Sequence, residues 1–364
     1  MYLRIVARRL GPADGTAMRV LVTGAAGFIG ARTADALAAA GHEVIGMDAL
    51  IPEAHGPEAV APPDVRFGDV RDGALLDSLL GGVDAVCHQA AMVGNGVDAQ
   101  DFPLYAAHND LGTAELLAAM ARNGVDRLVL ASSMVVYGDG AYSCEYDGIV
   151  RPAPRAVEDL AAGSFDPRCS VCGGPARWRP VDESAPIRPR TSYAASKVAQ
   201  ENLADAWCTM QSARCIALRY HNVYGPGMPA DTPYSGVAAI FRSALERGEA
   251  PRVFEDGKQL RDFVHVDDIA RANVAALATL DSHGTRATAY NVCSGTPFTI
   301  GEMAEVLARA AGGAAPIVTG ESRPFDVRHV VASPDRARTG LGFEARVRPE
   351  TGLAELASAR LRTR

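Results

Sequence analysis

Lysine is nearly absent from this chain of 364 residues: Lys197 and Lys258 are the only two, and arginine supplies the other positive side chains. The 43 acidic residues outnumber the 36 lysines and arginines, and no run of basic residues occurs. This charge balance argues against a protein that binds nucleic acid through a basic surface. No apolar stretch reaches the ~18 residues that a membrane-spanning helix needs. Because lysine is so scarce, a lysine inside a motif is more informative than usual.

Export features are also lacking. The first residues contain arginines but no long apolar core, so they do not resemble a secretory signal. The seven cysteines are odd in number, and four of them are scattered singly, which argues against a disulfide framework. We therefore expect a cytoplasmic protein in a reducing compartment. Residues 1–17 precede the first strong pattern and are expected to be a disordered extension or to lie upstream of the true start.

Short apolar runs alternate with helical stretches through the first 140 residues. Continuously apolar strands in such an alternation are typical of a parallel sheet that helices cover on both faces. The sequence predicts an α/β fold, a Rossmann-type doubly wound sheet over 18–225. Residues 139–190, rich in Pro, Gly, Arg and Cys, are expected to be an insertion. Residues 226–364 are expected to form mainly a smaller α/β substrate-binding lobe.

The run at 23–30 contains Gly24, Gly27 and Gly30 between a predicted strand and a predicted helix. Glycines allow a tight turn and close approach to a pyrophosphate, and the helix start, with Phe28 and Ile29, offers N–H groups to the phosphates. Asp48 ends the next strand 18 residues later, near the spacing of an acid that binds a ribose 2′-OH. An acid there repels a 2′-phosphate, which favours NAD over NADP. A glycine turn without a cofactor is the alternative.

Tyr193 and Lys197 are four residues apart, which places them on one face of a helix. A nearby cation favours the phenolate, so Tyr193 is expected to act as a general base toward a hydroxyl. Ser133 follows an apolar strand, where ligands bind in open α/β sheets, and is expected to hydrogen-bond a substrate oxygen. The alternatives are a chance spacing on a helix and a serine that caps a strand.

Together these motifs resemble the extended short-chain dehydrogenase/reductase superfamily, in its nucleotide-sugar epimerase/dehydratase branch. Further matches are GDV at 68–70, HQAA at 88–91, RYHNVYGP at 219–226 and RDFVHV at 261–266. The similarity extends from about Met18 to about Ala357, apart from the insertion. It implies an NAD-dependent enzyme, expected to be a homodimer, that acts on a nucleotide sugar.

The resemblance also implies roles for individual residues. Cofactor positions of the family fall here on Asp69, Val70, Ala90, Asn109, Tyr193 and Lys197. In that order, the first two would contact adenine, the next two would line the cofactor channel, and the last two would hold the nicotinamide ribose. Substrate positions fall on Ser133, Asn222, Phe254, Arg261, Arg323 and Asp326. Arginine suits the diphosphate because it pairs with phosphate through two parallel hydrogen bonds.

The serine motif continues with Met134 and Val135. Relatives that dehydrate or decarboxylate the sugar carry acidic residues there, and neither Met nor Val can move a proton. Epimerisation at C4 needs no such group, because the 4-keto sugar swings over and takes the same hydride back on its other face. The resemblance therefore favours a 4-epimerase over a 4-reductase or a dehydratase. A non-catalytic protein that senses NAD is a further alternative, although such proteins usually lose the tyrosine or the lysine.

The insertion contains Cys144 and Asp147, followed by Cys169 and Cys172 in a Cys-x-x-Cys-Gly turn. Thiolates in a reducing compartment bind zinc well, which indicates a structural zinc site. The pattern resembles a bacterial subgroup of dTDP-L-rhamnose 4-epimerases, which carries Cys-x-x-His before Cys-x-x-Cys. Asp147 stands where that histidine is expected, and this departure leaves a metal-free cluster as the alternative. The resemblance favours dTDP-L-rhamnose as substrate, with UDP-glucose, UDP-N-acetylglucosamine and UDP-glucuronate as alternatives.

Overall fold

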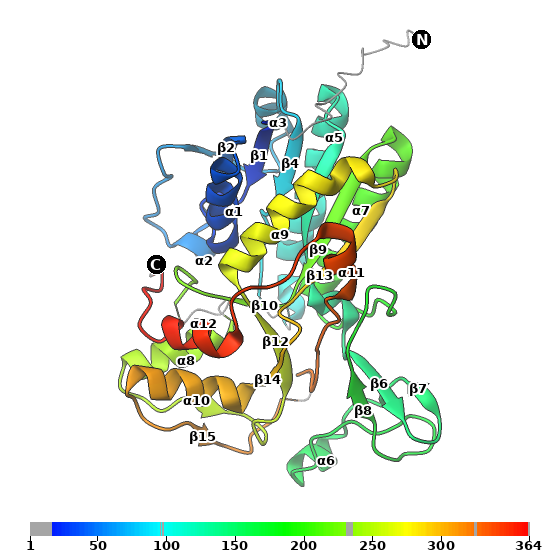
Figure 1. Cartoon of the computed structure of the whole chain (residues 1–364), viewed down its shortest axis with the longest axis vertical. Coiled ribbons are helices and arrows are strands. Elements are labelled where there is room, and N and C mark those ends of the chain that lie inside the picture. The colour runs from blue at the N-terminus through cyan, green and yellow to red at the C-terminus, as the bar shows by residue number, and fades with distance from the viewer. Residues whose placement is uncertain (1–16, 95, 97, 231–235, 324–325, 363–364) are drawn as a thin grey trace.

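A computed structural model describes residues 17–94, 96, 98–230, 236–323 and 326–362. Of the predicted extension at 1–17, all but Ala17 lies outside the described residues. Within the described part of the chain, no helix has both the length and the apolar character needed to cross a membrane. Figure 1 shows an upper lobe that contains the large sheet, a lower lobe, and a small lobe to one side formed by the insertion.

The upper lobe contains a seven-stranded parallel sheet in the order β3-β2-β1-β4-β5-β9-β13. Its strands are β1 (Arg19–Thr23), β2 (Glu43–Asp48), β3 (Val65–Phe67), β4 (Ala85–His88), β5 (Arg127–Ser133), β9 (Arg214–Tyr220) and β13 (Ala287–Val292). Val20, Leu21 and Val22 have no solvent exposure, as expected for a strand covered on both faces. The strand order reverses between β1 and β4, and ligands of open α/β sheets bind at such a point.

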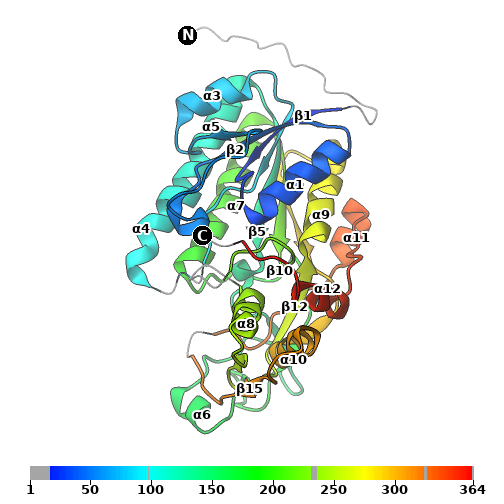
Figure 2. The same ribbon diagram turned by 90° about the vertical axis from the view of Figure 1, so that its left-hand side faces the viewer.

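Helices cover both faces of this sheet (Figure 2). One face packs against α1 (Phe28–Ala39), α9 (Val266–Thr279) and α11 (Asp335–Leu341). The other packs against α3 (Gly73–Leu80), α5 (Gly112–Asn123) and α7 (Ser192–Gln211). Shorter helices connect these layers: α2 (Pro52–His55), η1 (Ala99–Asp101), α4 (Phe102–Tyr105), the π-helix η2 (Ala106–Leu111), η3 (Met134–Tyr137) and η4 (Leu280–Ser282).

The lower lobe has its own apolar core between helices and short strands. Its strands are β10 (Asn222–Tyr224), β12 (Leu260–His265) and β14 (Pro297–Thr299) in one sheet, and β11 (Arg252–Val253) and β15 (Ile317–Val318) in another. Its helices are α8 (Val237–Glu246), α10 (Ile300–Ala311) and α12 (Pro349–Leu356). Because α9, β13 and α11 belong to the upper lobe, the lower lobe is discontinuous in sequence, and the predicted boundary at 225 marks only the first of several crossings.

The insertion at 139–190 is more regular than its sequence indicates. It forms an antiparallel sheet of β6 (Ala141–Cys144), β7 (Gly148–Val150) and β8 (Arg177–Arg179), with the short helix α6 (Val157–Ala161). All six residues of β7 and β8 are exposed or half-buried, so neither strand shows the apolar alternation that makes a strand visible in sequence.

Two buried histidines make the fold sensitive to acid. Burial lowers the pKa of both His88 and His221 from 6.5 to about 3, so both are neutral in the fold. The unfolded chain takes up protons below about pH 6.5, so the stability from each group is complete above that pH and is lost as the pH falls. Between pH 7 and pH 5, each histidine lowers the free energy of unfolding by about 2 kcal/mol.

We therefore expect His221→Gln to remove about 2 kcal/mol of the difference in stability between pH 7 and pH 5. Urea unfolding of both proteins at the two pH values measures this difference. An unchanged pH dependence in the variant would show that His221 is not held neutral by burial.

Candidate active site

The glycine turn joins β1 to α1 at the reversal of strand order. Gly24 has φ +69°, and a Cβ there would lie 2.7 Å from the backbone nitrogen of Ala90. The N–H of Gly27 donates to the carbonyl of Gly24 (3.0 Å), and a Cβ on Gly30 would lie 1.9 Å from that same oxygen. A side chain at Gly24 or Gly30 would therefore collide with the backbone of the turn or its neighbour. No side chain caps the start of α1 at Phe28, so its N–H groups are left open to a ligand.

A cavity of about 330 Å³ opens beside this turn. Among the residues that line it are nine of the predicted cofactor residues: Gly24, Gly27, Phe28, Ile29, Gly30, Asp48, Asp69, Val70 and Ala90. Sequence reasoning missed others in the lining, among them His55, Met228, Pro229 and Arg362. The size and shape of the turn and the acid at the end of β2 suit a dinucleotide.

Asp48 is held in place at the end of β2. Its Oδ2 accepts a hydrogen bond from the N–H of Ala26 (3.0 Å), and its Oδ1 accepts one from the N–H of Leu50 (2.8 Å). His55 on α2 places its Nε2 3.4 Å from Oδ1. Burial lowers the pKa of His55, although Asp48 acts in the opposite direction. The carboxylate is thus oriented before any ribose hydroxyl reaches it.

Asn109, another predicted cofactor residue, is not among the residues that line this cavity. Its side chain is fully buried, and its amide accepts from the N–H of Met92 (2.7 Å) and donates to the carbonyl of Met92 (3.0 Å). It also donates to Oγ of Ser196 on α7 (2.8 Å). Buried polar groups need hydrogen-bond partners, and the Asn109 amide supplies them for both backbone groups of Met92. Asn109 therefore holds the backbone of Met92, which is part of the cavity wall.

A second cavity of about 220 Å³ adjoins the first and shares Val223, Met228 and Gly236 with it. Ser133 at the end of β5, Tyr193 on α7 and Asn222 on β10 all line it. The predicted catalytic serine and tyrosine therefore face one space, next to the glycine turn. None of the described residues that line this second cavity is an aspartate or a glutamate.

The electrostatics of Tyr193 differ from the sequence expectation. Burial raises its pKa to about 12, while a hydrogen bond with Ser133 acts to lower it. Lys197 lies 5.9 Å from the ring centroid, and its Nζ donates to the carbonyl of Ala131 (2.9 Å). Burial lowers the pKa of Lys197 to about 8. In this structure loss of solvation therefore outweighs the effect expected from the lysine.

A buried ion pair supports α7 behind these residues. Nη2 of Arg219 on β9 lies 2.7 Å from Oε2 of Glu201, and Nε lies 2.9 Å from Oε1. Ser132 also donates to Glu201. Glu201 is four residues after Lys197, on the same helix face, so the spacing could have revealed it. The pair ties α7, which carries Tyr193 and Lys197, to the sheet. Trp207 and Cys208, further along α7, are buried in the core of the upper lobe.

Four of the predicted substrate residues line neither cavity: Phe254, Arg261, Arg323 and Asp326. Arg323 stacks over the ring of Phe254, 4.6 Å from its centroid, so these two are brought together. Arg261 instead donates to the backbone carbonyls of Leu260, Val327 and Arg328. Asp326 is exposed. Residues 324 and 325, which separate Arg323 from Asp326, lie outside the described part of the chain.

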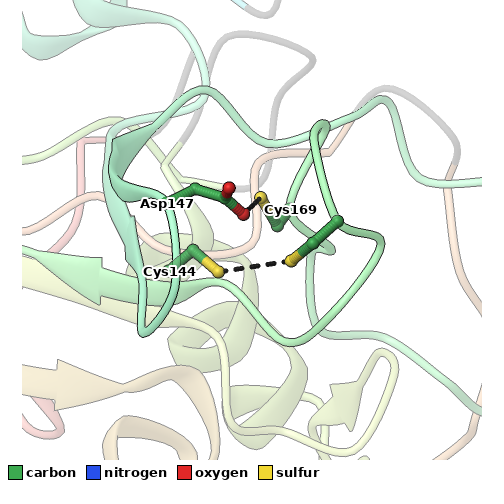
Figure 3. A group of neighbouring side chains, drawn as sticks. Cys144, Asp147 and Cys169 are labelled. Carbon is green, nitrogen blue, oxygen red and sulfur yellow. Dashed lines mark hydrogen bonds between the residues drawn. The ribbon is translucent and has the colours of Figure 1, made fainter.

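The predicted metal-binding residues of the insertion do converge (Figure 3). One donor atom from each of Cys144, Asp147, Cys169 and Cys172 lies within 4.8 Å of the others. Sγ of Cys144 is 3.4 Å from Sγ of Cys172, and Sγ of Cys169 donates to Oδ2 of Asp147 (3.2 Å). Cys144 ends β6, Asp147 lies in the turn before β7, and the other two lie in the turn that follows α6.

Comparison with known proteins identifies the family to which this chain belongs. The model of the "NAD dependent epimerase/dehydratase family" matches residues 20–157 and 158–293. The chain is 35% identical to a dTDP-L-rhamnose 4-epimerase of Burkholderia thailandensis, covering 93% of each protein. It is 31% identical to a UDP-glucose 4-epimerase of Mycolicibacterium smegmatis, covering 93% of this chain and 97% of that protein.

Among solved structures, the UDP-glucose 4-epimerase of Thermus thermophilus in complex with NAD superimposes with a TM-score of 0.73. That protein is 30% identical, and the match covers 93% of this chain and 98% of the other. The resemblance therefore extends through both lobes and includes the glycine turn and the Tyr-x-x-x-Lys helix. This chain belongs to the NAD-dependent epimerase/dehydratase family, within the extended short-chain dehydrogenases/reductases.

Proposed function

We propose that the protein is an NAD-dependent 4-epimerase of a nucleotide sugar. The second cavity carries this proposal: it presents Ser133 and Tyr193, adjoins the cavity that borders the glycine turn, and has no carboxylate in its described lining. A dehydratase needs an acid to eliminate water, whereas epimerisation at C4 needs only one base and a hydride acceptor. His221 also lines this cavity, but burial lowers its pKa to about 3, so it is neutral and poorly suited to move a proton at pH 7.

The residues act in a simple order in this proposal. The phenolate oxygen of Tyr193 takes the proton from the C4 hydroxyl while the C4 hydride leaves, and the C4–O bond becomes a carbonyl. When bound, NAD⁺ supplies the hydride acceptor and a positive charge that favours the phenolate. Ser133 donates a hydrogen bond to the C4 oxygen, and Lys197 adds positive charge on the same side. After the ketone turns over, the hydride returns to its opposite face and Tyr193 returns the proton.

For the substrate we propose dTDP-L-rhamnose, which gives dTDP-6-deoxy-L-talose. The converging Cys/Asp cluster and the similarity to the Burkholderia protein support this choice. UDP-glucose, UDP-N-acetylglucosamine and UDP-glucuronate are the alternatives, and the Mycolicibacterium relative supports the first of them. Incubation with each nucleotide sugar, followed by chromatography, gives the ratio of kcat/KM values. A preference of at least about 10-fold for dTDP-L-rhamnose is expected, and turnover of UDP-sugars alone would reject it.

The proposed enzyme has NAD as its cofactor and a nucleotide sugar as its substrate. The homodimer that the resemblance implies stays a prediction, which sedimentation equilibrium of the purified protein measures. A mass of about twice 38.2 kDa would agree with it.

We also propose that Cys144, Asp147, Cys169 and Cys172 hold a structural zinc ion. Zn–S bonds of about 2.3 Å place the sulfurs of a tetrahedral site about 3.7 Å apart, and the donor atoms here lie within 4.8 Å of one another. Three thiols and one carboxylate form a complete four-ligand set, so the site leaves no open position for catalysis. The ion would join the turn after β6 to the turn after α6 and so stabilise a lobe with few buried apolar residues.

Protein purified under reducing conditions is expected to contain about one zinc per chain by mass spectrometry of the metals. Cys169→Ser is expected to lose that zinc, whereas Cys208→Ser, a matched change in the core of the upper lobe, is expected to keep it. Thiol titration that finds Cys144 and Cys172 joined in a disulfide, with no metal present, would reject the zinc site. Sugar epimerisation by a metal-free protein would leave the catalytic proposal intact.

A further inference from the structure

The segment 360–362 returns from the lower lobe to the cofactor cavity. After α12 the chain runs toward α2, as the red ribbon in Figure 1 shows. Its backbone pairs with 227–230: the N–H of Arg362 donates to the carbonyl of Met228 (3.0 Å), and its carbonyl accepts from the N–H of Ala230 (2.9 Å). Leu361 is buried in the lower-lobe core. The position of Arg362 is therefore fixed from both sides.

The side chain of Arg362 spans the two edges of the cofactor cavity. Nη1 donates to the carbonyl of Ala26 in the glycine turn (2.9 Å), and Nη2 donates to the carbonyl of Ala54 on α2 (3.3 Å). These bonds join residues that are 336 and 308 positions apart in sequence. A guanidinium has five N–H donors, so two such bonds leave others available to a ligand.

The charge around this cavity makes Arg362 unusual. Of its described lining residues, Arg362 is the only arginine or lysine, whereas Asp48 and Asp69 are both acidic. None of the ion pairs found among the described residues includes Arg362. The diphosphate of a dinucleotide brings two more negative charges into this space. Helix N–H groups offset part of that charge, but a permanent cation offsets it more strongly and pairs with phosphate in a bidentate way.

We propose that Arg362 is a cofactor-binding residue that pairs with the diphosphate of the dinucleotide and thereby closes segments 227–230 and 360–362 over it. The lower lobe thus contributes directly to retention of the cofactor. An epimerase regenerates its cofactor in each turnover, so slow release costs it nothing. This inference rests on the dinucleotide site of the proposed function. The carboxylate of Asp48 interacts electrostatically with Arg362 and would repel a 2′-phosphate, which argues against a 2′-phosphate as the partner.

The test measures binding of ADP-ribose and of adenosine to protein from which bound nucleotide has been removed. Arg362→Met is expected to weaken ADP-ribose binding about 10- to 100-fold, as loss of a charged hydrogen-bonding partner does. Adenosine has no phosphate, so its affinity is expected to stay within about 2-fold. Arg362→Lys, which keeps the charge but not the fork, is expected to lie between the two. Arg360→Met is the matched control, because Arg360 lies two residues away and is exposed.

Three results would overturn the inference. Unchanged ADP-ribose affinity in Arg362→Met would show that the guanidinium serves only Ala26 and Ala54. An equal loss for ADP-ribose and adenosine would show a structural role, with the cavity itself deformed. Tighter binding of NADP than of NAD by the wild-type protein, lost in Arg362→Met, would assign the residue to a 2′-phosphate. Wild-type protein that binds no ADP-ribose at all would contradict the proposed function as well.

Discussion

Tyr193→Phe is expected to lower kcat at least about 100-fold, and as much as 10⁴-fold, while NAD content and substrate affinity stay close to those of the wild type. The change removes one oxygen atom, the one that faces the cavity beside Ser133. Of the other described residues in the lining, His221 has its pKa lowered to about 3, and the hydroxyl of Tyr220 donates to Gln89 and Asn273, so neither is as well placed to take the C4 proton. The ring centroid of residue 193 lies 5.8 Å from that of Tyr105, and we expect the phenylalanine ring to keep this position.

Tyr142→Phe is the control for the loss of a buried tyrosine hydroxyl. Tyr142 is 1% exposed and belongs to the insertion, and neither cavity includes it in the lining. We expect this variant to keep kcat within a few-fold of the wild type. If Tyr193→Phe also kept its turnover, the base would be another group. If the wild-type protein bound NAD but showed no turnover with any sugar nucleotide, a role in sensing the dinucleotide would be favoured instead.

Arg219→Met is expected to destabilise the fold by about 3–5 kcal/mol, because it leaves the Glu201 carboxylate buried without its cation. Arg219 and Glu201 are 4% and 8% exposed, and their two side chains meet through two short contacts. Glu201 also raises the pKa of Lys197 against the effect of burial, so it acts on the charge of Lys197 as well as, through its pairing with Arg219, on the position of α7.

Urea unfolding of the wild type and of three variants measures this effect. The double variant Arg219→Met with Glu201→Gln is expected to regain most of the loss, since neither charge is then left unpaired. Arg286→Met is the control, because Arg286 pairs with Asp205 on the same helix but is largely exposed, and it is expected to cost less than about 1 kcal/mol. A loss below about 1 kcal/mol for Arg219→Met would show that water reaches Glu201.

The cofactor turn could be predicted from sequence because its geometry depends on local rules. Gly24 and Gly30 are required by contacts within one turn, and Asp48 is found at the end of the next strand. Tyr193 and Lys197 follow from the helix period alone. In the insertion cluster, the spacing of Cys169 and Cys172 indicated a metal site and the resemblance added Cys144 and Asp147, although the strands of the insertion were not predicted.

Other parts of the site depend on contacts that no local pattern reveals. Arg362 reaches the glycine turn across 336 positions, and nothing in its immediate sequence marks it. Arg261, which the resemblance assigns to the diphosphate and ribose, also donates to the backbone carbonyls of 327 and 328, and only the fold brings these near it. The phenol of Tyr193 has its pKa raised because the folded chain excludes water from it, an effect that the spacing to Lys197 does not contain.

Proton NMR of dTDP-L-rhamnose with the purified protein in D₂O, with no cofactor added, follows the hydrogen at C4 through the reaction. We expect a new C4 epimer that carries no deuterium at C4, because the hydride leaves and returns within one site. Deuterium at C4 would contradict internal hydride return. No epimer from dTDP-L-rhamnose or from any of the three UDP-sugars, in protein shown to release bound NAD on denaturation, would contradict the proposed reaction itself.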